Sequence, residues 1–175
     1  MKNEKHSWRI MCRIAVFAFL IIGCNAEKPK TSVTEGNLES KDLLEFVPIL
    51  ENYRNGVLAN QNGEKIRTQI MTFSCVEGNR AYFCTANTKP LYAQLAAFPY
   101  VSYCTFPEDF EPVLSLNGKV VFVEDDAVRE RALESNYYAK QNFKTIENPL
   151  LAVFYIDVEE IETYSSEGVN IYAAK

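Results

Sequence analysis

One lysine stands between a segment with strand character and a segment with helix character. Residues 80–85 read RAYFCT, rich in aromatic and β-compatible residues, and a helical spacing of leucines begins at Pro90. Thr88 is placed to cap that helix, since proline is tolerated at a first helical position. Free N–H groups, a positive dipole end, Lys89 and the hydroxyls of Thr85 and Thr88 would then meet at one place. This pattern predicts a site for an anion such as phosphate; a solvated lysine beside a well-capped helix is the alternative.

The segments that position this site are joined mostly by short turns. Strands are predicted at 56–61, 64–76 and 80–85, with hairpin turns at 62–63 and 77–79, which indicates an antiparallel sheet. Further strands are predicted at 101–106, 113–123, 150–158, 161–165 and 169–172, where 113–123 is either a strand pair or one long strand bent at Asn117-Gly118. The pattern favours a mainly β (β+α) fold, a small closed or nearly closed antiparallel barrel.

Helices are predicted to flank the barrel. The first begins at Ser40 and ends at Gly56, with Pro48 kinking or dividing it. The second runs from Pro90 to the proline at position 99. The third is capped by Asp125 or Asp126 and extends through Leu133, and the tyrosine-rich segment 136–148 is predicted to be irregular.

The N-terminal residues have the features of a signal peptide. Basic side chains precede the apolar run 14–22, which is short for a membrane span, and the sequence LIIGC at 20–24 resembles a bacterial lipobox. We therefore expect a lipoprotein signal peptide at 1–23, a lipidated Cys24 with a polar tether at 24–38, and a domain at 39–175. Asn25 lacks the charge of an inner-membrane retention signal. The expected location is extracytoplasmic, on a bacterial membrane at the periplasmic or outer-membrane face; an ordinary N-terminal anchor helix is the alternative.

Charge and histidine content exclude several classes of function. Residues 1–23 hold four of the 18 basic and one of the 23 acidic side chains, so the remaining chain has 14 and 22, a net charge of −8. Such a chain is a poor candidate for nucleic acid or anionic membrane surfaces. The one histidine, His6, is lost with the signal peptide. This excludes Ser-His-Asp and Cys-His hydrolases and histidine-ligated zinc or haem, and no metal site is expected.

The cysteines outside residues 1–24 show no CxxC spacing. They are Cys75, Cys84 and Cys104, an odd number, so at least one is unpaired or bonds to another chain. All three are predicted to be small buried residues on strands.

Four motifs in order resemble the FMN-binding split β-barrel family of pyridoxamine 5′-phosphate oxidase-like proteins, over roughly residues 43–164. They are GVLANQNGEKIRTQ, RAYFCTANTKPLYAQL, FPYVSYC and LNGKVVFVEDDAVRERALES. The resemblance implies a split barrel that binds FMN in a groove between the two subunits of a homodimer. It carries Arg67 and Thr68 onto the opening of the family's R-x-R-P pattern. The residues that it implies for cofactor binding are Arg67, Thr68, Gln69, Thr85, Asn87, Thr88 and Lys89.

The chain also departs from that family. Gln69-Ile70 stands where many members have Arg-Pro, which removes one cationic contact, and the C-terminal Trp-Arg-Leu stretch of authentic pyridoxamine phosphate oxidases is absent from the ending NIYAAK. We therefore expect a redox flavoprotein that does not make pyridoxal phosphate. No side chain stands out as a catalytic acid or base, which suits chemistry that belongs to the flavin. Because flavin and nicotinamide are scarce outside the cytoplasm, the unknown electron donor would be a protein or a quinone-linked system. The alternative is a non-enzymatic ligand- or protein-binding lipoprotein on a degenerate barrel.

Overall fold

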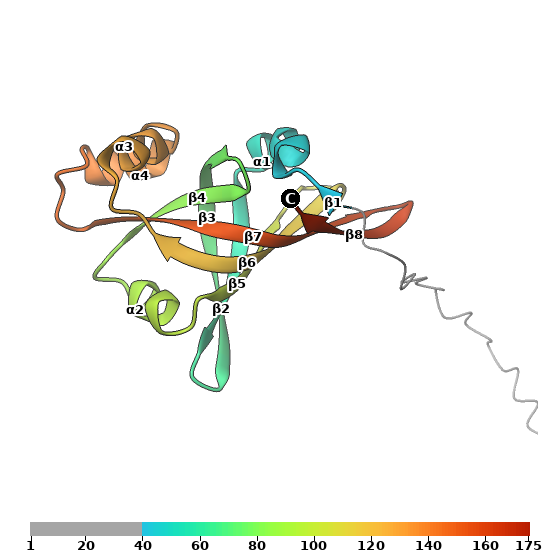
Figure 1. The fold of residues 1–175 in the computed structure, drawn as a ribbon, viewed down its shortest axis with the longest axis horizontal. Helices are drawn as coiled ribbons and strands as arrows, with labels where there is room; N and C mark the ends of the chain where they lie inside the picture. The colour runs from blue at the N-terminus through green and yellow to red at the C-terminus, as the bar shows by residue number, and fades with distance from the viewer. Residues whose placement is uncertain (1–39) are drawn as a thin grey trace, which may run out of the picture. The chain divides into compact units, whose positions relative to one another are not determined.

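The computed structural model describes residues 40–175 (Figure 1). The predicted signal peptide, Cys24 and the tether lie outside the described residues. The strands are β1 Ser40–Lys41, β2 Asn55–Asn62, β3 Lys65–Glu77, β4 Arg80–Ala86, β5 Tyr100–Thr105, β6 Val113–Phe122, β7 Leu151–Ser165 and β8 Gly168–Ala174. The helices are the 3-10 helix η1 Leu43–Phe46, α1 Val47–Asn52, α2 Pro90–Ala97, α3 Asp126–Glu134 and α4 Tyr137–Phe143.

Six of these strands close into a ring. Their order is β7-β4-β3-β2-β5-β6, and β6 pairs again with β7, while β8 and β1 extend the sheet beyond β7. All neighbours in the ring are antiparallel, and the closing β6–β7 ladder runs from Val113↔Tyr164 to Phe122↔Phe154. The prediction of a small, mainly β antiparallel barrel with flanking helices is confirmed. Among residues 40–175, no helix is both long enough and apolar enough to cross a bilayer.

Strands β3 and β4 pair along only part of their length. These strands pair at Phe73↔Phe83, Val76↔Ala81 and Glu77↔Arg80, with a bulge between Phe73 and Val76. Residues 65–72 of β3 pair with β2 alone and project as a hairpin at the bottom of Figure 1. Because β3 and β4 diverge beyond Phe73, the barrel wall is split at this point.

Two apolar clusters lie on opposite faces of β4, because successive side chains of a strand alternate. Phe83 faces the barrel interior, where its ring lies 5.5 Å from that of Phe154 and 4.8 Å from that of Tyr103. Tyr82 faces outward into a second cluster that includes Leu133 of α3. The barrel core therefore stabilises the ring, while the second cluster holds α3 and α4 against its outside (Figure 1).

The N-terminal helix differs from the prediction. Ser40 lies in β1, and Asp42 instead caps η1 by accepting a hydrogen bond from Leu44 N at 2.9 Å. Pro48 divides the segment, because it stands in the first turn of α1, and α1 ends at Asn52 rather than at Gly56. Leu44 of η1 is exposed.

Three further segments refine the prediction. Residues 136–148 are not irregular throughout, since α4 occupies Tyr137–Phe143 under an Asn136 cap. Residues 161–165 continue β7 rather than forming a separate strand. Residues 113–122 form one strand with a register shift at Asn117/Gly118, which is the second of the two alternatives. Asp125 caps α3.

Candidate functional site

A hollow opens where β3 and β4 part. Its volume is about 390 Å³, within the range of roughly 300–1,000 Å³ that is common for small-molecule sites. The strands contribute Ile70, Met71, Thr72, Cys84, Thr85 and Ala86. Lys89, α4 and the loop before β7 line the rest. The lining residues come from both faces of β3 and β4. The hollow therefore lies within the barrel wall, at the split between these two strands.

Thr85 presents a free hydroxyl to this hollow. Its side chain is 3% exposed, on the same face of β4 as Phe83. The hydroxyl makes no hydrogen bond within the described residues, and it is not among the polar atoms sealed from solvent. Buried hydroxyls are normally paired, because leaving one unpaired costs about 1–3 kcal/mol. An unpaired hydroxyl that faces a hollow is therefore a donor available to a ligand.

Lys89 is the one charged side chain lining the hollow, within the part of the chain that the structure describes. It occupies the N-cap position of α2 with φ −77° and ψ 145°, so Thr88 does not cap this helix, and the cap lacks a side-chain hydrogen bond. Asn87 N and Lys89 N donate to Leu150 O and Ala86 O at 2.9 and 3.1 Å. The prediction that free N–H groups gather here is therefore wrong for these two groups. Of the predicted donors, Lys89 and Thr85 remain as residues that line the hollow.

Asn136 connects α4 to β3 beside the split through side-chain hydrogen bonds. The sequence analysis did not identify this residue. It is 3% exposed, and its amide nitrogen donates to Thr72 O at 3.0 Å and to Ser74 Oγ at 3.1 Å. Its oxygen accepts from Ala139 N at 3.0 Å, which caps α4. One side chain thus pairs with β3 where β4 has diverged and starts the helix that covers the gap. An asparagine directly before a short helix was the available signal.

Gln69 does not line the hollow. Alternation along β3 places Arg67, Gln69 and Met71 on one face and Thr68 and Ile70 on the other. Gln69 Nε2 donates to Asn60 Oδ1 at 2.9 Å, so its amide is engaged inside the chain rather than with a ligand.

The other predicted site residues surround the hollow without lining it. Arg67 and Thr68 are exposed on the projecting hairpin, with Arg67 about 13 Å along the strand from Met71. Asn87 donates its amide to Pro149 O at 2.7 Å, which ties the turn after β4 to the loop before β7. Thr88 is exposed and lines no part of the hollow. Of the predicted site residues, Thr85 and Lys89 line the hollow and the others do not.

The cysteines lie on β3, β4 and β5 as predicted, and all three are free thiols that are half-buried rather than fully buried. Cys84 lines the hollow with its sulfur 3.8 Å from Ser74 Oγ. Burial raises the pKa of Cys84 from 9.0 to about 12. Burial also raises the pKa of Cys75. Because a thiol reacts as its thiolate, Cys84 is an inert wall residue at neutral pH.

Apolar side chains surround the mouth of the hollow. Ile70 is 78% exposed, and Tyr138 and Leu150 are also exposed although they line the hollow. Ile66 adds a further exposed apolar side chain on the same face of β3. A second hollow of about 490 Å³ adjoins the first and shares Thr72, Asn136 and Tyr138 with it. An exposed apolar rim of this kind is typical of an interface.

Known structures with this architecture superpose well on the chain. A NimC/NimA family protein from Clostridium acetobutylicum matches with a TM-score of 0.66 and 20% identity, covering 75% of this chain and 91% of that one. A second protein from that organism, related to general stress protein 26 of the pyridoxine phosphate oxidase family, matches with a TM-score of 0.64 and 13% identity, covering 75% and 93%. The chain has the fold of the pyridoxamine 5′-phosphate oxidase-like proteins. The resemblance expected from the four sequence motifs is thus confirmed for the fold.

One protein with a similar fold is described by the ligand that it binds. A heme binding protein from Mycobacterium smegmatis matches with a TM-score of 0.60 and 17% identity, covering 71% of this chain and 55% of that one. No protein-family model matches the sequence, and no curated protein matches it either. Since these identities are low, the function of the split-barrel chain has to be argued from its own hollow.

Proposed function

We propose that this split-barrel protein is an FMN-binding flavoprotein of oxidoreductase type that acts as a homodimer. The observation that carries the proposal is that Lys89 and the buried Thr85, whose hydroxyl makes no hydrogen bond within residues 40–175, line the same hollow at the split. A cation and a hydroxyl donor at one end suit a phosphate, and the apolar and amide walls suit a planar heteroaromatic ring.

Some of the residues expected to bind FMN fit the cofactor where they lie. Lys89 would neutralise phosphate charge as a point charge and Thr85 would donate a hydrogen bond to it. Ile70, Met71 and Tyr138 would exclude water from the ring. Arg67 would reach the cofactor only if the ligand extended along the hairpin, with Thr68 beside it on the opposite face. FMN, once bound, would supply the hydride and electron transfer.

The apolar rim supports the homodimer. Ile66, Ile70, Tyr138 and Leu150 are exposed around the mouth, and a second copy placed there would bury them and cover the open side of the hollow. Sedimentation of the purified protein tests this part of the proposal, since a strict monomer would leave the cofactor half uncovered.

The extracytoplasmic location and the lipid on Cys24 also belong to the proposal and rest on the sequence pattern at 1–38 alone. Membrane attachment would follow from that lipid, and the electron donor would be a protein or quinone-linked partner. Mass spectrometry of the N-terminal fragment from cells tests the anchor directly.

A discriminating experiment compares FMN with riboflavin, which lacks the phosphate. Purified protein is mixed with each flavin, desalted and examined by absorption, and the dissociation constants are measured by flavin fluorescence. We expect FMN to bind at least about tenfold more tightly, because the charge-assisted contacts are worth about 1.5–3 kcal/mol. Lys89→Ala should reduce the preference for FMN, and the Thr85 hydroxyl would supply what remains of it. The matched control is Lys65→Ala, which removes an exposed lysine from the hairpin.

A second candidate function is a non-enzymatic ligand-binding module. Lys89 as the single charged lining residue favours it, because one cation balances only part of a phosphate's charge. Protein that stays colourless after incubation with FMN would support the module and overturn the flavoprotein. Equal affinity for the two flavins would show that Lys89 and Thr85 do not hold the phosphate.

A further inference from the structure

Three amide side chains join β3, β2 and α2 in a directed chain. Gln69 Nε2 donates to Asn60 Oδ1 at 2.9 Å, and Asn60 Nδ2 donates to Gln94 Oε1, also at 2.9 Å. The second hydrogen of the Asn60 amide goes to Gln61 O at 3.1 Å. Asn60 is 2% exposed, whereas Gln69 and Gln94 are half-buried. The central amide is therefore fixed in one orientation by its partners.

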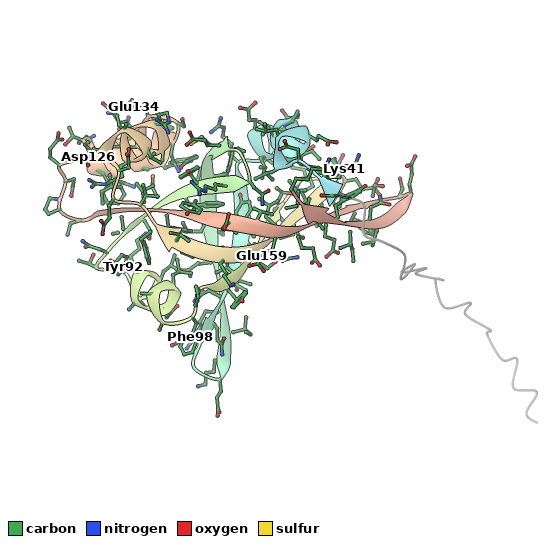
Figure 2. All side chains as sticks on the ribbon, viewed as in Figure 1. Lys41, Tyr92, Phe98, Asp126, Glu134 and Glu159 are labelled. Atoms are coloured by element: carbon green, nitrogen blue, oxygen red, sulfur yellow. The ribbon has the colours of Figure 1, made fainter. Side chains whose placement is uncertain are left out.

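The Gln69–Asn60–Gln94 chain supplies a directional contact to α2, which the apolar contacts of this helix do not. Leu91 and Leu95 insert into the barrel core, and the ring of Tyr92 lies tilted against that of Phe122, with 4.5 Å between the ring centroids (Figure 2 marks Tyr92). Apolar burial sets how deeply the helix sits but tolerates rotation about its axis. The Gln94–Asn60 hydrogen bond is directional, so it defines which way α2 is turned.

Neither end of the amide chain lines the hollow, but β3 carries lining residues and Lys89 caps α2. Gln69 directly precedes Ile70 and Met71 of the β3 wall. Gln94 lies in the turn of α2 that follows Lys89. A displacement of Asn60 would therefore reach the strand wall and the lysine together.

We propose that the Gln69–Asn60–Gln94 chain is a positioning device that sets Lys89 against the β3 wall of the hollow. The three residues are positioning residues rather than ligand contacts, and their role in cofactor binding rests on the proposed function. Through Asn60, the Gln69 amide links β3 to α2.

The first test needs no ligand and follows backbone amide exchange in α2. Gln69→Leu keeps the side-chain size but leaves Asn60 Oδ1 buried without its donor, so Asn60 loses its fixed orientation. Since Gln69 lies on β3, a merely local role would leave α2 unchanged. We expect exchange at residues 91–95 to accelerate about three- to tenfold. The matched control is Asn117→Ala, which removes a part-buried 2.9 Å amide bond to Glu160 at the β6–β7 bulge.

The reverse perturbation covers the case in which Gln69→Leu does not fold. Gln94→Met removes the other end of the chain at a half-buried position, and the reporters become the amides of Ile70 and Met71 on β3. Faster exchange at the far end in either variant supports the device. Unchanged exchange at the far end, in whichever variant folds, overturns it.

The second test measures FMN affinity in the same variants. We expect Gln69→Leu to weaken FMN binding about three- to tenfold with little change for riboflavin, while Asn117→Ala changes neither. If the wild-type protein retains no FMN, the proposed function fails and the exchange experiment alone decides the positioning chain. If FMN binds and Gln69→Leu leaves its affinity unchanged, the positioning role is overturned.

Discussion

Replacing Thr85 by valine should separate binding from stability. Valine has the shape of threonine with a methyl group for the hydroxyl, and it suits a strand. Because the Thr85 hydroxyl makes no hydrogen bond within the described residues, its removal leaves no other polar group there without a partner. Burying a methyl group in place of an unpaired hydroxyl should leave the free energy of unfolding unchanged or raise it by up to about 1 kcal/mol, or about 3 °C in the melting temperature.

FMN binding should change in the opposite direction. A hydrogen bond to a charged phosphate is worth about 2 kcal/mol. Its loss in Thr85→Val should raise the dissociation constant for FMN roughly 30-fold. Riboflavin affinity should hardly move, because riboflavin has no phosphate. Thr85→Ser should retain most of the FMN affinity, since it keeps the hydroxyl. Flavin fluorescence titration and urea unfolding followed by circular dichroism measure both effects on one preparation.

Thr105 provides the matched control. It is also a buried strand threonine, 1% exposed, but its hydroxyl accepts from Leu114 N at 2.9 Å. Thr105→Val leaves the Leu114 N–H without its hydrogen-bond acceptor. The variant should lose about 1–3 kcal/mol of stability without a change in flavin affinity. If Thr85→Val lost as much stability as Thr105→Val, the hydroxyl would have a partner in the folded chain. If it bound FMN as tightly as the wild type, the phosphate would lie elsewhere.

Three further predictions concern stability. Asn136→Ala should cost about 3 kcal/mol in urea unfolding, because it removes three buried hydrogen bonds including the α4 cap, whereas Asn142→Ala on the same helix should stay within about 0.5 kcal/mol. Folding raises the pKa of Cys84 from 9.0 to about 12, so the folded chain keeps a proton that the unfolded chain loses. Stability should fall as the pH rises above about 9, by about 1 kcal/mol at pH 10, and Cys84→Ala should flatten this slope; an equal slope in the variant would refute the assignment. Gly118→Ala should cost about 3 kcal/mol, because its Cβ would overlap the Asp157 carbonyl where β6 closes on β7, and an unchanged urea midpoint would show that the closure yields.

Local chemistry allowed the hairpins and caps to be predicted from the sequence. Gly63 and Gly78 have φ values of 62° and 56°, as tight turns between strands demand, and both turns were expected. Asp125 caps α3 through a bond to Val128 N, which is likewise a contact within a few residues. The turn after β4 brought Thr85 and Lys89 to attention for the same reason.

Contacts between distant residues escaped prediction. The Asn60–Gln94 bond spans 34 positions and the Asn136–Ser74 bond spans 62, so no local pattern announces them. The hollow itself depends on where β3 and β4 stop pairing, which is a property of register rather than of composition. Helix α4 was missed because it is held by its cap and by the packing of Ala139 more than by an apolar stripe.

The position of β7 in the ring has a consequence for how the protein is made. This strand pairs with β4 along one edge, with β6 along the other, and carries β8 beyond them, yet it begins only at Leu151. A ribosome therefore has to release the residues up to the end of β7 before the barrel can close. Until then the edges of β4 and β6 stay open. A chain in that state depends on protection from aggregation until its last strands are available for pairing.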